Sequence, residues 1–301
     1  MKKIIQDIRA YFIETDKPVL LICMLVLSVG IYLNYAFDVN GYINQQSQSQ
    51  QFIYWYLIFF SSLCLPYCVG YLLYSENTFK NGRFLLLLIL APALFAWKMS
   101  AWFFFSFSDQ SIENVYWNRV VYWPLKLLVM LGGLMIFWKY FNKENHFYGV
   151  GTSGFKPRPY AWMLLIMIPL IAAASTQPDF LKMYPKLQHM IPQHYSLPVW
   201  KKLLFELSYG LDFVGIELYF RGFLILAFVQ WAGKDAILPM AIFYCTIHFG
   251  KPLGECVSSF FGGIILGVVT YHTQTIWGGL IVHLGIAWLM ELGGFIGNYY
   301  S

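Results

Sequence analysis

The sequence predicts an all-α membrane protein, a polytopic bundle of about eight or nine transmembrane helices. Hydrophobic residues make up 58% of the 301 residues and charged residues only 12%, whereas a soluble domain is about 45–50% apolar and about 25% charged. Long apolar segments follow one another, and most lysines and arginines flank them. This composition excludes soluble, disordered, collagen-like and disulfide-rich proteins, and the scattered basic residues indicate no nucleic-acid partner.

Nine apolar segments have the composition of membrane-spanning helices, each of which needs about 20 mostly apolar residues. In order along the chain they are 18–37, 52–74, 84–105, 120–138, 160–175, 203–230, 237–250, 255–271 and 276–292. The fifth and seventh segments are short for a complete span. The sixth is long enough to be tilted or broken, so the expected number of spans is eight or nine.

The basic residues predict the orientation of the chain in a membrane. With the N-terminus inside, alternating spans place 11 lysines and arginines in inside segments and six in outside segments, while Lys98, Lys126 and Arg221 lie within spans. Because cytoplasmic loops carry the excess of basic residues, we expect a cytoplasmic N-terminus. No small-residue cleavage site follows the first apolar segment, so we expect an uncleaved anchor of a cell (inner) membrane protein.

A proline-rich connecting loop at 176–199 separates two parts of the chain. The transmembrane helices of 1–175 carry few polar groups, and their role is unknown from the sequence. Residues 200–292 form the predicted functional domain, and 293–301 form a tail. In the eighth segment of that domain, small residues recur every four positions from Ser259 to Gly267, a pattern that lets two helices pack closely.

Several ionisable residues interrupt the apolar segments of the predicted functional domain. A charged residue at the centre of a membrane helix costs roughly 2.5–3.5 kcal/mol, so a group of them indicates a functional site. The sixth segment contains Glu206, Asp212, Glu217 and Arg221, the seventh contains His248, and the ninth contains His283 and Glu291.

The spacing in the sixth segment separates two carboxylates. Glu217 and Arg221 are four residues apart, so they share a helical face and can pair. Asp212 and Ile216 also share a face, which is turned by about 100° from that of Glu217. Asp212 therefore lies one turn from the Ile216 position but does not point where Glu217 points.

Glu217, His248 and His283 offer one carboxylate and two imidazoles from three separate segments. We expect them to gather, with Asp212 nearby, in one pocket surrounded by apolar protein. Such a set can activate a water molecule and stabilise an oxyanion. It can also bind zinc or another divalent metal through two histidines and one glutamate, with a position open for water. A metal-free site and buried polar groups satisfied by neighbouring helices are the alternatives.

Four short segments stand in this region in a recognisable order. The first reads Glu217-Leu-Tyr-Phe-Arg221 and the second reads Tyr244-Cys-Thr-Ile-His248. The third runs from Phe260 to Gly267 and the fourth from Ile276 to His283. In order and spacing they resemble the motifs of the CPBP family, which includes type II CAAX prenyl endopeptidases and bacteriocin-processing or immunity proteins. The resemblance covers about residues 200–292.

This resemblance implies an all-helical intramembrane endopeptidase whose substrate is a membrane-embedded or lipidated peptide or protein. It implies that Glu217 and His248 activate water and that His283 stabilises the oxyanion. It also implies that Arg221 holds Glu217 in place. A metal bound by Glu217, His248 and His283 agrees with the resemblance, and so does a metal-free mechanism.

Two positions depart from the family's pattern. Ile216 stands where the first glutamate, the expected base, is found, and Ala287 stands where the fourth motif has asparagine. Three interpretations follow: Glu217 is the base, Asp212 is a substitute base, or the site is a binding cavity without catalysis. Pairing with an arginine would lower the pKa of Glu217 and make it a poorer base.

The sequence therefore leaves three functions open. The favoured one is an intramembrane endopeptidase of the CAAX type. The departures at Ile216 and Ala287 favour a second, a non-catalytic membrane adaptor or bacteriocin immunity protein. A small-solute transporter is the third, with the charged sixth segment lining its pathway, although the sequence shows no inverted repeat.

Overall fold

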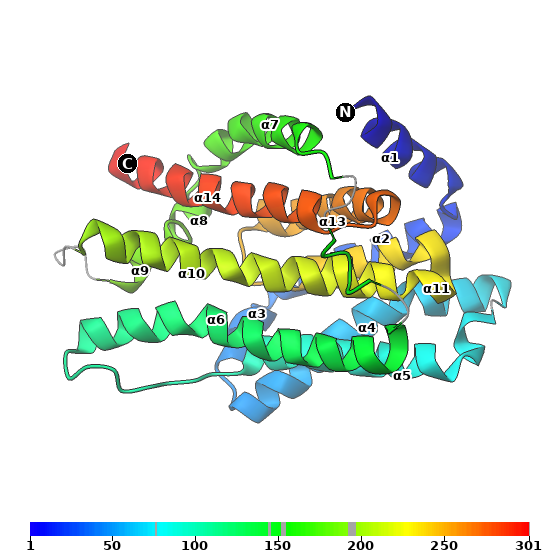
Figure 1. Ribbon diagram of the computed structural model, residues 1–301, viewed down its shortest axis with the longest axis horizontal. Coiled ribbons are helices and arrows are strands. Elements are labelled where there is room, and N and C mark those ends of the chain that lie inside the picture. The colour runs from blue at the N-terminus through cyan, green and yellow to red at the C-terminus, as the bar shows by residue number, and fades with distance from the viewer. Residues whose placement is uncertain (76, 144–145, 152–154, 192–196, 301) are drawn as a thin grey trace. The chain divides into compact units, whose positions relative to one another are not determined.

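The computed structural model describes residues 1–75, 77–143, 146–151, 155–191 and 197–300. All regular elements in these residues are helical, and none is a strand (Figure 1). The predicted all-α fold is therefore confirmed.

Six helices among the described residues are long and apolar enough to cross a membrane. They are α2 (Lys17–Ala36), α4 (Gln48–Tyr74), α5 (Gly82–Ser100), α6 with its continuation η2 (Ser111–Asn142), α13 (Leu253–Thr273) and α14 (Trp277–Tyr300). Only 28–56% of the apolar stretch in each helix is buried inside the molecule, so much of this apolar surface faces outward. These features are those of an integral membrane protein.

The other three predicted spans take different forms. The fifth is α7 (Arg158–Ala174), which is shorter than a typical span. The sixth is α10 (Val199–Glu217) followed directly by a π-helix, η3 (Leu218–Ala227). The seventh is α12 (Ile237–Thr246), whose ten residues are all buried, as in a helix of a protein core. The expected count of eight or nine spans stays a prediction.

Shorter helical elements connect these helices. They are α1 (Lys2–Glu14), α3 (Val39–Asn44), η1 (Asn77–Lys80), α8 (Pro178–Leu181), α9 (Lys186–Met190), α11 (Val229–Ala232) and η4 (Gly233–Ala236). Within the long element that ends in η2, α6 itself spans Ser111–Phe137 and η2 spans Trp138–Asn142.

The chain forms two compact units, and the boundary passes through both α6 and the α10–η3 junction. The first unit contains Met1–Trp102, Gly133–Thr152 and Leu218–Ile276, and the second contains Phe103–Gly132, Ser153–Glu217 and Trp277–Ser301. The division predicted from the proline-rich loop at 176–199 stays a prediction.

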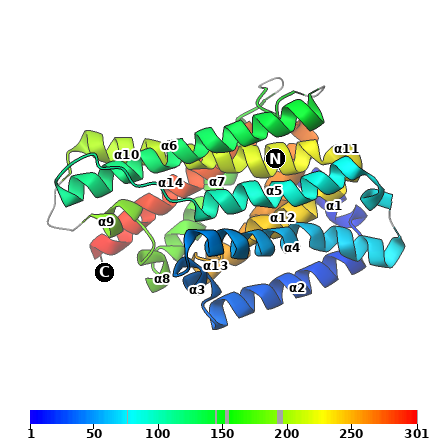
Figure 2. The same cartoon turned by 90° about the horizontal axis from the view of Figure 1, so that it is seen from below.

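In the first unit, the buried helix α12 packs against α4, α13 and η3. Helix α13 approaches α12 closely, because a Cβ atom added at Gly263 would lie 3.3 Å from Ala241 and one at Gly267 would lie 2.8 Å from Met240. The small residues of α13 therefore face α12, as their spacing predicts. Figure 2 shows α2, α4 and α5 of this unit as neighbouring helices.

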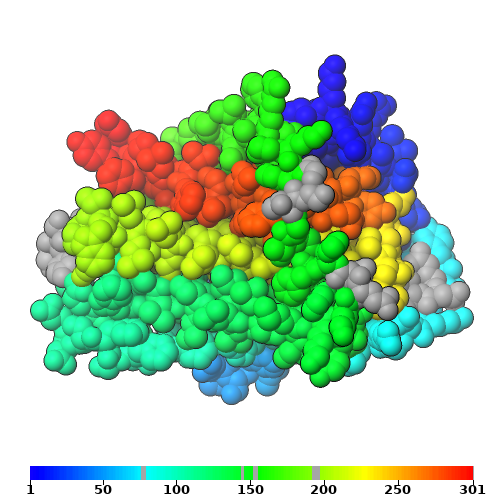
Figure 3. All heavy atoms as spheres, in the orientation of Figure 1, coloured from blue at the N-terminus to red at the C-terminus, as the bar shows by residue number. Residues whose placement is uncertain are grey.

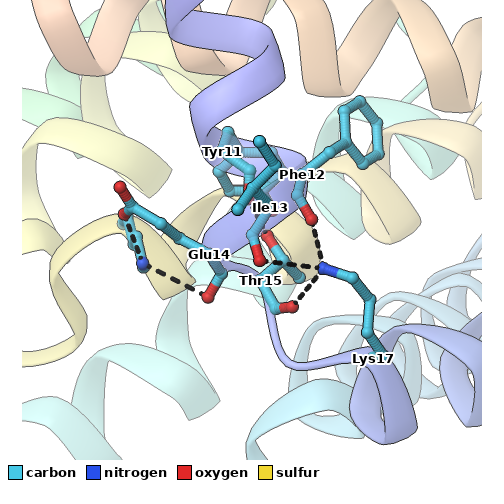
Figure 4. Close-up of polar contacts among 7 residues, drawn as sticks. Tyr11, Phe12, Ile13, Glu14, Thr15 and Lys17 are labelled. Carbon is cyan, nitrogen blue, oxygen red and sulfur yellow. Dashed lines mark hydrogen bonds and ion pairs between the residues drawn. The ribbon is translucent and has the colours of Figure 1, made fainter.

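Helix α1 is joined to the first unit at its C-terminal end (Figure 4). The Glu14 carboxylate accepts a hydrogen bond of 2.7 Å from the Lys234 ammonium of η4. The Lys17 ammonium, in the first turn of α2, donates to the backbone carbonyls of Ile13 (3.1 Å) and Thr15 (2.8 Å). The end of α1 is thus tied to both α2 and η4.

In the second unit, α10 lies between α6 and α14, and α7 covers the other side of α14 (Figure 1). Helices α6 and α10 run in the same direction, and their residues pair at a constant sequence separation. The Ser208 hydroxyl donates to the Val120 carbonyl, and a Cβ atom at Gly215 would lie 3.4 Å from Leu127. Each pair differs by 88 positions in the sequence, so the two helices stay in register over two turns.

A proline creates one of these contacts. Pro124 lies inside α6 and has no N–H to donate to the carbonyl four residues earlier, which is that of Val120. The Ser208 hydroxyl of α10 donates to this carbonyl instead. The Val120 carbonyl thus links α6 to α10 through this hydrogen bond. An unpaired carbonyl at this buried position would be costly.

Helix α14 approaches both of its neighbours through glycines and large side chains. A Cβ atom at Gly210 of α10 would lie 3.3 Å from Leu284 of α14. Toward α7, a Cβ atom at Gly278 would lie 2.2 Å from the Tyr160 ring and one at Gly285 would lie 2.6 Å from Leu164. These close approaches fix how deep each residue of α14 lies beside α10.

The described part of the proline-rich segment is ordered against α14. Phe180 and Tyr184 form a buried cluster with Ile171 of α7. The Glu291 carboxylate of α14 accepts a 2.9 Å hydrogen bond from the backbone N–H of Lys186, the first residue of α9. Residues 192–196, which include one of the four prolines of the predicted loop, lie outside the described residues.

Candidate active site

Glu217 and His283 form a hydrogen-bonded pair within the second unit. The last residue of α10, Glu217, is completely buried, and its Oε1 atom lies 2.8 Å from Nδ1 of His283 on α14. The His283 side chain keeps 13% of its surface exposed. Two residues that are 66 positions apart therefore meet because α10 and α14 pack closely.

The contact determines which nitrogen of His283 carries a proton. An ionised carboxylate can only accept a hydrogen bond, so Nδ1 must donate. In the neutral imidazole, Nε2 then keeps its lone pair and can take a proton or bind a metal. A carboxylate on Nδ1 also stabilises the imidazolium that forms when Nε2 is protonated.

Phe213 holds the His283 ring from a second side. It lies one turn before Glu217 on α10, and its ring meets the His283 ring edge to face with centroids 4.7 Å apart. Both contacts come from one face of α10. The imidazole is thus positioned by a hydrogen bond and by an aromatic packing contact from the same helix.

Asp212 lies on a different face of α10. It stands four residues after Ser208 and three before Gly215, which both contact α6, so it shares their helical face. Consistently, its carboxylate interacts electrostatically with Tyr122 of α6. The structure therefore places Asp212 toward α6, whereas Glu217 is directed to His283 of α14.

In the first unit, Arg221 and His248 both contact the ring of Tyr244. Arg221 lies in the π-helix η3 and is completely buried. Its guanidinium carbon lies 4.2 Å from the centroid of the Tyr244 ring, within the range of a cation–π interaction. The His248 ring meets the same Tyr244 ring at 4.8 Å between centroids.

His248 lies in the turn after α12 with a defined tautomer. Its Nδ1 atom lies 2.9 Å from the backbone carbonyl of Tyr244. A carbonyl oxygen can only accept, so Nδ1 carries the proton and Nε2 keeps its lone pair in the neutral ring. Both histidines of the candidate site therefore present Nε2 as the reactive nitrogen.

The turn that carries His248 is fastened to α2. The Asn34 side-chain amide donates to the Phe249 carbonyl at 2.9 Å, and the Tyr35 hydroxyl donates to the Lys251 carbonyl at 2.6 Å. These bonds satisfy backbone groups that follow the end of α12. The helices at the N-terminal end of the chain thus help to position a residue of the candidate site.

Among the described residues, no group of three or more His, Cys, Asp or Glu side chains is arranged to hold a metal ion. Oε1 of Glu217 is engaged with the Nδ1 atom of His283. Zinc or another divalent ion bound by Glu217, His248 and His283 stays a prediction.

Comparison with protein families identifies the part of the chain that contains these residues. Residues 198–289 match the family model described as type II CAAX prenyl endopeptidase Rce1-like. The C-terminal third of the chain resembles these endopeptidases. The resemblance predicted from the four motifs is thereby confirmed, at nearly the predicted boundaries. Comparisons with curated proteins and with solved structures gave no match.

The Rce1-like region contains all five candidate site residues. The structure brings Glu217 together with His283 in the second unit, and it brings Arg221 and His248 onto Tyr244 in the first. That the residues of both units serve one reaction stays a prediction, as does the pairing of Glu217 with Arg221.

The ring of Tyr244 makes two contacts that the sequence did not predict. The buried Arg221 guanidinium lies over the ring, and the His248 imidazole packs against it at a steep angle. A phenylalanine offers the same face, so the aromatic ring is what the two contacts require.

Proposed function

We propose that this protein is an intramembrane endopeptidase of the CAAX type. It hydrolyses a peptide bond near a membrane-embedded or lipidated segment of its substrate. Support comes from the Rce1-like region at residues 198–289 and from the six apolar helices. The observation that carries the proposal is the hydrogen bond between Glu217 and His283, because it prepares an imidazole to act as a base.

The Glu217–His283 pair activates the attacking water. Nε2 of His283 removes a proton as the water oxygen bonds to the scissile carbonyl carbon. Glu217 orients the imidazole through Nδ1 and stabilises the imidazolium. The same Nε2 then returns the proton to the leaving amide nitrogen as the carbon–nitrogen bond breaks, which yields a carboxylic acid and an amine.

His248 and Arg221 serve the same reaction in this proposal. A histidine whose Nδ1–H is held by a backbone carbonyl donates from Nε2 only when it is protonated, and in that state it stabilises an oxyanion. The Arg221 guanidinium, held over the ring of Tyr244, supplies a fixed positive charge. Because Glu217 bonds to His283, Ile216 at the preceding position does not remove the base from this mechanism.

Cleavage by purified protein tests the proposal. Wild type, His248→Ala and His283→Ala are purified in detergent and incubated with a library of membrane-segment and lipidated peptides. The exposed histidine His272 of α13 provides a matched control, His272→Ala. We expect wild type and His272→Ala to cleave, and both site variants to lose most activity. Equal behaviour of all four proteins would refute the endopeptidase.

A non-catalytic adaptor or immunity protein is the second candidate. Ile216 and Ala287 favour it, since both replace residues of the family motifs. In that case, His248→Ala and His283→Ala would keep the partner-binding or protective phenotype of the wild type in cells. For either function we propose a location in the cell (inner) membrane with a cytoplasmic N-terminus, as the distribution of basic residues predicts.

A further inference from the structure

Residues 103–107 of the second unit form an extended segment beside the first turns of α6 (Figure 1). The Asn118 side chain accepts a hydrogen bond of 2.8 Å from the Phe105 N–H and donates one of 2.7 Å to the Phe105 carbonyl. Asn114, one turn earlier on α6, accepts a hydrogen bond of 2.8 Å from the Phe107 N–H. Two residues of the segment thus span four residues of helix, or about 6 Å, as two residues of a β-strand do.

The segment has the alternation of a β-strand, in which successive residues turn their backbone groups to opposite edges and their side chains to opposite faces. Phe105 and Phe107 turn their N–H groups to α6, and their rings lie together with centroids 5.6 Å apart. Phe104 and Ser106 therefore turn their N–H and C=O groups away from α6. In the part of the chain that the structure describes, no hydrogen bond reaches these groups. We name them the open edge.

The open edge lies at the surface of the molecule. Phe104 is 72% exposed, and Ser106 is exposed as well. Figure 3 shows this part of the chain in teal at the lower left. A strand edge that stays unpaired in a protein usually carries a lysine, a proline or another feature that blocks pairing. Residues 103–108 contain only phenylalanine and serine, so nothing in this sequence blocks the edge.

The open edge also lies at a level inside a membrane span. Each residue of α6 lies beside the residue 88 positions later on α10, which places Asn118 and its partner Phe105 beside Glu206. Glu206 interacts electrostatically with Glu291 of α14. Glu291 stands 9 residues before the end of the candidate span Trp277–Tyr300, or about 14 Å inside it. At such a depth, unpaired backbone groups are costly unless protein or water covers them.

The open edge is separate from the Glu217–His283 pair. Val120 and Leu127 of α6 face α10. Asn118 stands two residues before Val120, so it is turned from it by about 160° around the helix. The extended segment therefore lies on the side of α6 opposite to α10. A peptide bound there is held at a distance from the reacting bond, at an exosite.

An extended peptide is the partner that fits the open edge. Acyl chains of lipids have no hydrogen-bonding groups, so they would leave the edge unpaired. The segment runs along α6, so two copies inserted the same way round would present their edges in the same direction. The antiparallel pairing of identical strands across a two-fold axis is then unavailable. A peptide strand can pair with both residues of the edge and place alternate side chains against the exposed phenylalanines.

We propose that the backbone of Phe104 and Ser106 binds an extended, apolar segment of the peptide substrate by β-strand addition. This inference rests on the proposed endopeptidase function for the identity of the peptide, and it adds an exosite to that function. Main-chain hydrogen bonds supply affinity, and the phenylalanine rings favour apolar or aromatic side chains at alternate positions of the peptide. Asn114 and Asn118 hold the segment in the extended form that this pairing needs.

Binding of a backbone-modified peptide tests the exosite without requiring turnover. The probe is a fluorescent peptide in which about eight alternating valine and threonine residues lie between lysine ends. Its control has the same sequence but carries N-methyl groups on two adjacent central amides, which block both edges of the peptide strand. Dissociation constants are measured in detergent for wild type, His283→Ala, Ser106→Pro and Ser106→Ala. Ser106→Ala is the matched control for Ser106→Pro, because it keeps the backbone N–H.

We expect wild type to bind the unmodified probe at least about tenfold more tightly than the N-methylated one, because backbone hydrogen bonds are lost. His283→Ala and Ser106→Ala should keep this ratio. Ser106→Pro removes an N–H of the open edge, so its ratio should fall to near one. The ratio compares two ligands of one preparation, so a partly misfolded variant does not distort it. Infrared spectra of a probe with one ¹³C-labelled carbonyl should show strand pairing on wild type.

Equal affinity of wild type for both probes would overturn the exosite, even if other peptides were cleaved. A preference that survives in Ser106→Pro would overturn it as well. A dimer that Ser106→Pro converts to a monomer would assign the open edge to a second copy instead. A preference lost in His283→Ala would place the peptide at the Glu217–His283 pair and remove the exosite. Selective binding with no cleavage of any peptide would retain the strand site and refute the endopeptidase.

Discussion

Asp212 and Glu217 lie on different sides of α10, because Asp212 faces α6 whereas Glu217 bonds to His283 of α14. Only Glu217 is therefore placed to act on the imidazole of the candidate site. Asp212 instead interacts with Tyr122 of α6. The two carboxylates that the sequence offered as alternative bases thus have separate surroundings.

Removing the two carboxylates should have unequal effects on catalysis. Glu217→Gln leaves Nδ1 of His283 without its acceptor charge, so we expect the turnover number to fall by about 10²–10⁴-fold. Asp212→Asn should change turnover by less than about tenfold, because it leaves the pair intact. Initial rates on a cleaved membrane peptide measure both. A larger loss in Asp212→Asn would instead support the substitute-base interpretation.

Position 278 of α14 should tolerate no side chain larger than glycine where it meets α7. Gly278→Ala would place a Cβ atom 2.2 Å from the Tyr160 ring, and such overpacking costs about 1–3 kcal/mol. Gly262→Ala in α13 is the matched control, since no atom lies within 4 Å of the added Cβ. Thermal unfolding in detergent should show a lower midpoint for Gly278→Ala alone. Equal midpoints would contradict the packing of α14 on α7.

A cysteine pair reports on the contact between α12 and α13. The sulfur atoms of Cys245 and Cys256 lie 3.9 Å apart, and both residues are buried. Diamide should therefore oxidise the two thiols to an intramolecular disulfide and be reduced to its hydrazine. Peptide mass spectrometry should find the bridge in wild type and not in Cys256→Ser. Absence of the bridge under denaturant-free oxidation would argue against this helix contact.

The attachment of α1 should depend on pH in the acidic range. The hydrogen bond from Lys234 holds the pKa of the Glu14 carboxyl below its ordinary value of 4.5. A group with a lowered folded-state pKa stabilises the fold above its ordinary value, and this contribution is lost as the pH falls through the folded pKa. We expect α1 to stay attached from neutral pH to about pH 5 and to loosen below 4.5.

Distances between spin labels on α1 and α11 measure this attachment as the pH is lowered. Glu14→Gln provides the control, because its amide does not titrate. The acid-dependent change should be present in wild type and absent in the variant. The same change in both proteins would show that another group controls α1.

The sequence predicted the long helices well, because each of them is identified by its own length and apolar composition. The runs that became α2, α4 and α13 are about 20 apolar residues long, and length alone identifies them. The run at 237–250 is equally apolar, but it forms a short helix buried in protein. Hydrophobicity does not distinguish protein from lipid as the surrounding medium, so the burial of α12 could not be predicted.

The sequence named the candidate site residues, but it did not predict the contact between Glu217 and His283. Spacing along one helix suggested Arg221 as the partner of Glu217. That pairing stays a prediction, whereas the contact of Glu217 with His283 joins residues 66 positions apart and depends on how Gly210 lets α14 approach α10. The π-helix that carries Arg221 has no signal in a pattern based on 3.6 residues per turn.

A double-mutant cycle on Glu217 and His283 tests the central claim most directly. The kcat/KM values of wild type, Glu217→Gln, His283→Ala and the double variant are measured on one cleaved peptide. Residues that act as a unit are strongly non-additive, so we expect the double variant to be no slower than His283→Ala alone. Independent losses that multiply in the double variant would contradict the Glu217–His283 pair as the group that activates water.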